Sequence, residues 1–322
     1  MGLTSESDSG SVRYSRVIRL PGALALGTAV SVGLGVYTLL GQFVRLSSYE
    51  STAIPYLLMI LLMLPAILTL AERGGVVAGR SPHALTRLSP YRSFRFAHGW
   101  LTLIGYVSLI ALLSWGVALH LNLLWQPMLD LSDHLPELAT AVLGLAALSY
   151  VLRAGLRWQL RGLLIYLAIG LVILLSLWRL THYDLETLAQ RAASSSSPLE
   201  SLTLATLMVS GLWGSNFILH ARNQTRRPVR TIPLALLLTL LIGGGLGALA
   251  ALIVENFSAV SPAHPAPLAV VIDHLVNAPL PLETWVYALL GLSITSTALN
   301  RGFLALTDLM DEMAEEGYWP DW

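Results

Sequence analysis

Long uncharged stretches alternate with short polar connections along the whole chain. A helix of about 20 apolar residues crosses a hydrocarbon layer of about 30 Å, and eight stretches reach or approach that length. They are residues 20–44, 53–71, 96–124, 138–152, 162–178, 202–220, 232–254 and 284–306. Their apolar residues run continuously and do not alternate with polar ones, which excludes the strands of a membrane barrel. The pattern predicts an all-α integral membrane protein with about eight transmembrane helices.

The polar residues are grouped between and beside these stretches. Residues 1–19 form a polar N-terminal tail, and residues 307–322 form an acidic C-terminal segment after the last stretch. The connection 258–281 is rich in proline and encloses the apolar sequence PLAVVIDHLV, which predicts a short helix. We therefore expect one transmembrane domain over residues 20–306, with a short segment on either side.

Composition agrees with a membrane protein and removes several kinds of chemistry. Only 12% of the 322 residues are charged, about half the share in a typical soluble domain. The chain has no cysteine and no lysine, which excludes disulfides, a cysteine nucleophile and a lysine Schiff base. No phosphate-binding loop with lysine, HExxH or GxSxG motif occurs, so no enzymatic activity is predicted. The charges are segregated by region, and no nucleic-acid partner or cofactor is predicted.

The distribution of the arginines predicts how the chain is oriented across the membrane. Fifteen of the 19 lie in the tail and in three alternate loops: Arg13, Arg16, Arg19, Arg73, Arg80, Arg87, Arg92, Arg95, Arg153, Arg157, Arg161, Arg222, Arg226, Arg227 and Arg230. The opposite loops hold only Arg45, Arg179 and Arg191. Because loops rich in arginine stay on the cytoplasmic side, we expect a multi-pass protein of the cell (inner) membrane with both termini in the cytoplasm.

The first stretch contains an unusual concentration of glycine. Five glycines lie in residues 20–44, and Gly33 and Gly35 flank Leu34 near its middle. Each glycine costs a helix about 1 kcal/mol relative to alanine, so this position favours a break in the helix. Backbone groups freed by such a break need a ligand or a lining cavity in the membrane. Alternatively, the glycines only allow neighbouring helices to pack closely.

Several segments together resemble the amino acid–polyamine–organocation permeases. Gly33-Leu34-Gly35-Val36-Tyr37 is similar to that superfamily's G-S-G-I-F segment, and Gly99-Trp100 resembles its recurrent G-W. The segment 228–233 (PVRTIP) looks like the motif that follows the sixth helix, and 313–320 (MAEEGYWP) like the one after the eighth. The resemblance implies a leucine-transporter-like inverted repeat of five plus five helices, with helices one and six interrupted. The second repeat is then incomplete, because this chain has eight of the family's usual twelve spans.

The resemblance also implies where a substrate is held. Its carboxylate would meet the N–H groups of Gly33, Leu34 and Gly35, and its ammonium would meet carbonyls near Ser31 and Val32. The break in helix six would fall within residues 210–216, and its site residues would be Gly211, Trp213, Gly214 and Asn216. Two glycines near the middle of that span agree with a break independently of the resemblance.

The coupling ion is left open between H⁺ and Na⁺. No carboxylate lies well inside a predicted span, which disfavours a carboxylate proton relay, and His98, His120 and His220 are expected at the membrane interface. Arg301 is the one cation inside an apolar run, where it has a function or else either extends to the membrane interface or pairs with Asp308.

The last span also carries a run of hydroxyl side chains. In the sodium-coupled relatives, hydroxyls of helix eight help to bind the cation, which makes Thr295 and Ser296 a candidate cation site. Otherwise these hydroxyls only form hydrogen bonds across membrane helices.

The function expected from these observations is transport of small neutral amino acids by alternating access. A site made mostly of backbone groups offers no fixed charge to a charged side chain. The alternative is a non-transporting membrane protein, either a truncated permease or a subunit completed by another chain. The partners expected are the amino-acid substrate, the lipid bilayer and either a second copy or a complementing chain.

Overall fold

The computed structural model describes residues 18–47, 52–74, 83, 86, 89–126, 131–151, 198–255, 266–276 and 282–318. Within these residues the chain is helical and has no strand, which confirms the predicted all-α class. The long helices are α3 (Ala53–Gly74), α4 (Arg92–Trp125), α5 (Leu135–Val151), α10 (Pro228–Glu255) and α12 (Leu282–Glu315). The shorter segments are α1 (Leu20–Val32), η1 (Gly33–Thr38), α2 (Leu40–Leu46), η3 (Ser132–His134), α8 (Pro198–Met208), η4 (Val209–Leu212), α9 (Gly214–His220), η5 (Arg222–Gln224) and α11 (Pro267–Val276).

Six helical segments of the described residues are long and apolar enough to cross a membrane. They span residues 20–38, 53–74, 92–125, 199–220, 228–255 and 284–315, and each coincides with a predicted stretch. A seventh predicted stretch coincides with α5, whose 17 residues make it shorter than these six. The predicted span 162–178 and the tail residues 1–17 lie outside the described residues. These helices are those of a multi-pass membrane protein.

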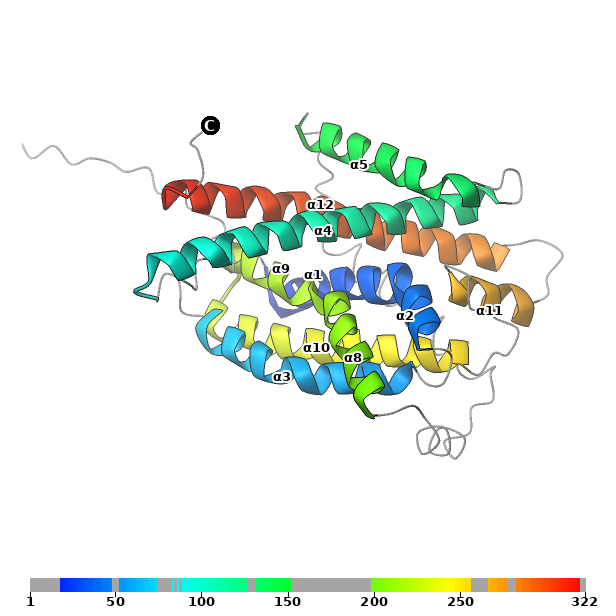
Figure 1. The fold of residues 1–322 in the computed structure, drawn as a ribbon, viewed down its shortest axis with the longest axis horizontal. Coiled ribbons are helices and arrows are strands. Elements are labelled where there is room, and N and C mark those ends of the chain that lie inside the picture. Colours follow the sequence, from blue (N-terminus) through cyan, green and yellow to red (C-terminus); the bar gives the residue numbers. More distant parts are fainter. Residues whose placement is uncertain are drawn as a thin grey trace, which may run out of the picture.

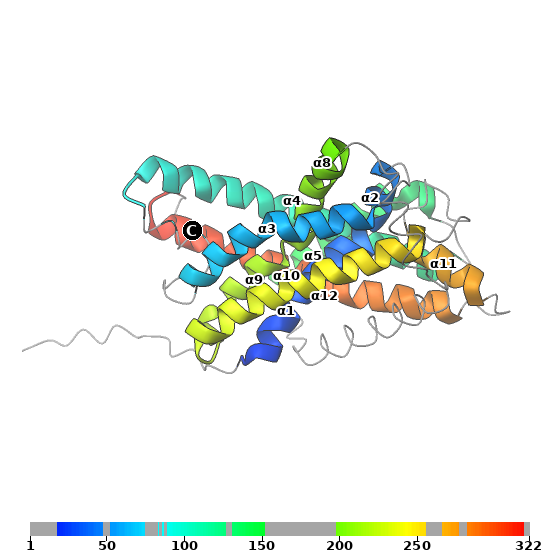
Figure 2. The ribbon, with the colours of Figure 1, turned by 90° about the horizontal axis from the view of Figure 1, so that it is seen from below.

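The long helices form two pairs with the first span between them. In Figure 1, α4 lies alongside α12, and α3 lies alongside α10, with α1 between the two pairs. The helix α5 packs on α4, and α8 crosses α3 at a steep angle that Figure 2 also shows. The first span therefore contacts both pairs and occupies the centre of the bundle.

Side-chain size explains why the first span is central. In the apolar window of this span 78% of the residues are buried, against 28% in that of α3. Small residues such as Ala23, Ala25 and Ala29 cover α1 and let other helices approach it closely. By contrast, α3 presents Leu57 and Leu61 on its outer surface. An exposed apolar surface of this kind suits contact with lipid.

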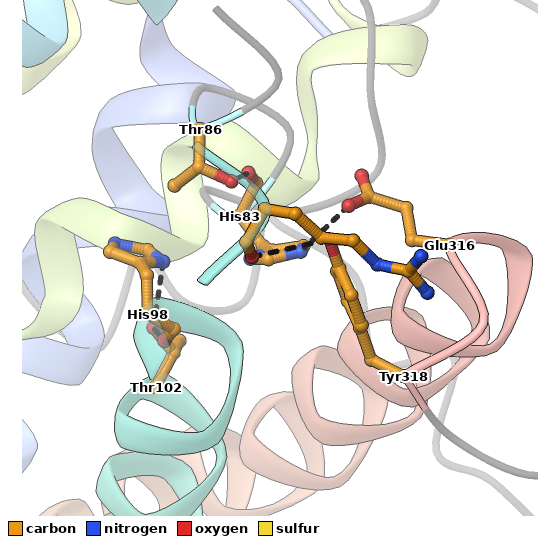
Figure 3. Close-up of polar contacts among 7 residues, drawn as sticks. His83, Thr86, His98, Thr102, Glu316 and Tyr318 are labelled. Carbon is orange, nitrogen blue, oxygen red and sulfur yellow. Dashed lines mark hydrogen bonds and ion pairs between the residues drawn. The ribbon is translucent and has the colours of Figure 1, made fainter. Parts of the chain in front are cut away.

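Polar contacts join the α3–α4 connection to the start of α4 and to the residues just after α12 (Figure 3). The helix α12 continues past residue 306, the predicted end of the last span, as far as Glu315. Beyond it, the Glu316 carboxylate lies 3.7 Å from Nε2 of the fully buried His83. The His83 ring stacks on that of His98 at a centroid distance of 5.8 Å. The connection from α3 to α4 is thus anchored to both helices of the α4–α12 pair.

Candidate functional site

Both segments in which the sequence predicts an interruption depart from α-helical geometry. In the first span, α1 passes directly into the π-helix η1. In the other span, α8 is followed by the 3-10 helix η4 and then, after Trp213, by α9. π-helical segments are rare and occur frequently at functional sites, so these two segments define the candidate site.

The two interruptions meet at a pair of glycines. A Cβ atom placed on Gly211 would lie 3.1 Å from the Cα of Gly35, and one on Gly35 would lie 3.4 Å from the carbonyl oxygen of Gly211. Backbone therefore packs closely against backbone at this point, and a side chain on Gly211 would require its neighbour to shift by a few tenths of an ångström. In this state the two interruptions are closed against each other.

Hydrogen bonds satisfy the backbone of the first interruption. The Thr38 hydroxyl donates to the Gly33 carbonyl (2.8 Å), and the Leu39 N–H donates to the Leu34 carbonyl (2.9 Å). The hydroxyl of the buried Tyr56, on α3, donates to the Gly35 carbonyl at 2.8 Å. The expected open, unwound turn is therefore wrong in form, because the chain continues as a wider helix whose carbonyls find donors.

The backbone N–H at the N-terminal end of η1 also has hydrogen-bond partners. The Gly33 N–H donates to the carbonyls of Ala29 and Val30 within the helix. Gly33 itself faces the side chain of Ile294 on α12, at 3.0 Å from an added Cβ. A substrate carboxylate would reach this N–H only after η1 rearranges.

The second interruption is held by short-range bonds and by close packing. The Trp213 N–H donates to the Ser210 carbonyl at 3.4 Å, and the Asn216 N–H donates to the Trp213 carbonyl at 3.1 Å. These bonds span three residues, as in a 3-10 helix. A Cβ on Gly214 would come within 2.1 Å of the Gly27 carbonyl oxygen, so α9 begins directly on the backbone of α1.

The residues predicted to bind substrate fall into two groups. Ser31, Val32, Gly33, Leu34 and Gly35 are buried on the first span, and Gly211 and Gly214 are buried opposite them, whereas Trp213 and Asn216 are half-buried. The structure brings Gly35 against Gly211 and Ser31 against Gly214, whereas Gly33 faces Ile294. The Trp213 ring instead packs on Gly105 and Tyr106 of α4.

Ser31 has an unusual environment. Its hydroxyl is buried and has no hydrogen-bond partner among the described residues. It lies beside Gly214 of α9, whose added Cβ would be 2.4 Å from Oγ, and beside Gly243 of α10. An unsatisfied buried hydroxyl costs stability, so Ser31 is a polar group available to a ligand between α1, α9 and α10.

Thr295 and Ser296 bond to their own helix. The buried Thr295 hydroxyl donates to the Gly291 carbonyl at 2.6 Å, and the Ser296 hydroxyl donates to the Leu292 carbonyl at 2.6 Å. Among the described residues, no group of three or more histidine and acidic side chains is arranged to hold a metal ion.

A polar cluster that the sequence did not predict lies next to Trp213. The Tyr106 hydroxyl and the His220 Nε2 atom are 2.7 Å apart, and the His220 Nδ1 atom is 3.4 Å from an Asp308 oxygen. Pairing with Arg301 was one alternative for Asp308; in the structure Asp308 lies against His220 on another helix. The three residues come from α4, α9 and α12, and their separation in sequence concealed their contact.

A second unpredicted cluster lies further along α4. Tyr37 of η1 stacks on Tyr287 of α12 with ring centroids 5.3 Å apart, and His120 of α4 packs against both rings. His120 is fully buried among neighbouring side chains, and the His220 side chain is nearly so.

No family model matches the chain, and no curated protein matches it.

Proposed function

We propose that the chain is a secondary transporter that moves amino acids, small neutral ones in particular, across the cell (inner) membrane by alternating access. In this proposal it is a permease of the amino acid–polyamine–organocation type with a leucine-transporter-like bundle and cytoplasmic termini. The substrate lies between η1 and η4, and no catalytic chemistry is involved.

The meeting of the two interruptions is the observation that carries this proposal. Two spans far apart in sequence each change their helical geometry over a short segment, and a glycine of one segment, Gly35, touches a glycine of the other, Gly211. In a membrane, irregular backbone is tolerated where it is buried in protein or lines a cavity. A small separation of η1 from η4 would expose peptide groups of both segments to one ligand, and these groups suit an ammonium and a carboxylate.

The surroundings favour a small and uncharged side chain on the substrate. An added Cβ on the glycines of η1 and η4 would meet the side chains of Ile294 and Phe43 and backbone atoms, and hydroxyl groups of Thr38 and Tyr56 bond the glycine carbonyls; none of these groups is charged. Ser31 adds one buried hydroxyl without a partner. Because the two glycines already touch, substrate binding requires that the segments move apart, and closure around a small ligand restores most of their contact.

One observation favours the alternative of a non-transporting membrane subunit. The carbonyls of η1 already have donors, from Tyr56 and Thr38 among others. A bundle that only packs its helices has the same need for bonded carbonyls and close glycines. Such a subunit would hold η1 and η4 together permanently, and a measurement of transport separates the two functions.

The deciding experiment is exchange of radiolabelled amino acids in proteoliposomes that contain the purified chain. Each of the twenty amino acids is loaded inside at millimolar concentration, and entry of the labelled form is measured against empty liposomes. The proposal expects exchange of one or more small neutral amino acids. If none of the twenty enters faster than into empty liposomes, the transporter proposal is wrong.

A pair of glycine variants tests the location of the site. Gly33→Leu places a bulky side chain against Ile294 at the first interruption and should abolish exchange. Gly245→Leu, on the outer face of α10 with open space around it, should retain exchange and serves as the matched control. If Gly33→Leu is expressed normally and exchanges substrate as fast as wild type, the substrate does not bind at η1.

A further inference from the structure

A short backbone bridge joins the start of the first span to the link between α9 and α10. Ile18, which precedes α1, forms an isolated parallel bridge with Thr225. The Ile18 N–H donates to the Gln224 carbonyl at 2.9 Å, and the Arg226 N–H donates to the Ile18 carbonyl at 2.7 Å. Figure 2 shows the starts of α1 and α10 at the same end of the bundle. The bridge therefore brings Arg19 next to Arg226.

The side chains of these two arginines point outward. Successive side chains of an extended backbone lie on opposite sides of it. Ile18 and Thr225 are buried, with 5% and 0% of their surface exposed, whereas Arg19 and Arg226, which follow them, are both exposed. The two arginine side chains therefore lie together on the outer side of the bridge.

Two more exposed arginines follow within one turn. Arg227 and Arg230 are exposed, and the Arg230 N–H donates to the Arg227 carbonyl at 3.0 Å. Arg227 has a φ of 52°, a left-handed conformation that favours glycine, and it is the one described residue other than glycine with a positive φ. Strain of this kind is concentrated at functional sites. The chain thus keeps a cation at a position where glycine fits the backbone better.

The positive charge of this surface is not balanced by nearby carboxylates. We call the exposed arginines Arg19, Arg226, Arg227 and Arg230 the arginine patch, and none of their guanidinium groups forms an ion pair or hydrogen bond within the described part of the chain. Arg222 has interactions of its own and is not counted in the patch. Gly74 ends α3 beside Ile232, and the exposed Glu72 and Arg73 before it add no net charge.

An apolar strip on α10 continues from the arginine patch. Since α10 is long and apolar enough to cross a membrane, its first turn lies at a membrane surface. Arg230, Leu234, Leu241 and Gly245 are exposed and follow one another at intervals of four, seven and four residues, which places them on one face of the helix. The space beside Gly245 is open. This face therefore offers a path for an acyl chain that starts at the patch.

An anionic phospholipid fits both parts of this surface. The planar guanidinium group of arginine forms paired hydrogen bonds with the oxygens of a phosphate group. Arginines near a membrane surface also attract anionic headgroups electrostatically. A soluble phosphate compound matches the arginine patch but leaves the apolar face of α10 unused.

We propose that the arginine patch binds the headgroup of an anionic phospholipid whose acyl chain lies along the exposed face of α10. The bound headgroup connects Arg19, at the start of the first span, to Arg226 and Arg230, beyond the end of the α8–α9 span. It therefore reinforces the backbone bridge and holds the two interrupted spans together at this end. The inference applies equally to a transporter and to a non-transporting subunit.

Thermal unfolding of the purified full chain in detergent, followed by tryptophan fluorescence, tests this inference. A ligand that binds the folded state raises its unfolding temperature. The probes are dioleoyl phosphatidylglycerol, phosphatidylcholine with the same acyl chains, and glycerol phosphate at the same phosphate concentration. Phosphatidylglycerol should raise the unfolding temperature in a saturable manner, and the other two compounds should not.

Three variants locate the lipid, each measured against its own unfolding temperature in phosphatidylcholine. Arg226→Gln and Arg230→Gln remove an exposed charge and leave the backbone bridge in place. Each should raise the phosphatidylglycerol concentration of half-maximal effect about fivefold, and the double variant about 25-fold. The matched control is Arg45→Gln, an exposed arginine at the opposite end of the first span, which should respond as wild type does.

Hydrogen exchange provides a second measurement at the bridge itself. The amides of Ile18 and Arg226 are the two donors of the bridge. Phosphatidylglycerol should slow their exchange in wild type and in Arg45→Gln, and it should have no such effect on the double variant at the same concentration. Unchanged exchange of both amides in wild type would show that the lipid does not reinforce the bridge.

Each remaining outcome contradicts the inference in its own way. Equal stabilisation by phosphatidylglycerol and phosphatidylcholine would mean that the headgroup charge is not recognised. Equal stabilisation by glycerol phosphate would mean that the arginine patch binds a soluble phosphate compound and not a lipid. A wild-type response of the double variant would place the lipid elsewhere. An equal loss in Arg45→Gln and Arg226→Gln would mean that only the overall charge of the protein matters.

Discussion

The two interruptions deviate from the α-helix in opposite directions and are held in different ways. The first, η1, is a π-helix and is wider than an α-helix, whereas the second, η4, is a 3-10 helix and is narrower. Hydroxyl groups of Thr38 and Tyr56 bond the carbonyls of η1. The segment around η4 depends instead on the space left by Gly211 and Gly214.

This difference predicts how each interruption fails. A bond from a side chain is worth about 1 kcal/mol, and its loss leaves the packing unchanged. An added methyl group that meets backbone has no flexible neighbour to displace, and the helices must separate. The second interruption should therefore be far less tolerant of change than the first.

The largest effect is expected at the start of α9. Gly214→Ala puts a methyl group against the Gly27 carbonyl and the Ser31 backbone of α1. Overpacking of this kind costs about 1–3 kcal/mol and sometimes more, so thermal unfolding of the purified protein in detergent should begin several degrees lower.

Gly245→Ala is the matched control for this variant. Its methyl group meets open space on the outside of α10, and alanine is the better helix former. Its unfolding temperature should equal or exceed that of wild type. A Gly214→Ala protein as stable as the control would show that α9 does not rest on the α1 backbone.

A smaller effect is expected at the first interruption. Tyr56→Phe keeps the ring that packs on Gly247 and removes only the hydroxyl that bonds the Gly35 carbonyl. The cost should be about 1–2 kcal/mol, because one buried carbonyl loses its donor. Thermal unfolding measures this effect, and Tyr91→Phe, at an exposed position, is the control. An equal loss in both variants would mean that the hydroxyl of Tyr56 has no special part in holding η1.

The sequence predicted the positions of these interruptions but not their form. Continuous apolar runs located the helices, and paired glycines marked residues 33–35 and 211–214 as weak points. Whether a weak helix unwinds depends on the donors that reach its carbonyls. The donor for Gly35 is Tyr56, on the next helix, and a pattern along one span contains no information about it.

The cluster around His220 escaped prediction for a related reason. Hydropathy placed the end of the last span near residue 306, so Asp308 was assigned to a separate polar segment. In the structure the helix continues to Glu315 and carries Asp308 to His220. Charged residues at the end of a long helix lower the mean hydropathy of that end. Hydropathy therefore ends the span too early, even where the helix continues and packs inside the bundle.

The smallest change in stability and the most selective change in binding are expected at Ser31, where the two interruptions share a boundary. Its buried hydroxyl has no partner among the described residues, and Thr239 of α10 has a hydroxyl of the same kind that faces Gly27. Ser31→Ala and Thr239→Val should therefore leave the unfolding temperature unchanged or slightly raised, because each removes an unsatisfied polar group. If the Ser31 hydroxyl bonds the substrate, Ser31→Ala should raise the substrate concentration that half-saturates exchange, and Thr239→Val should not. The increase should be about five- to tenfold for a bond of about 1 kcal/mol. A destabilised Ser31→Ala protein would contradict this account, since it would mean that the hydroxyl already has a structural partner and is not available to a ligand.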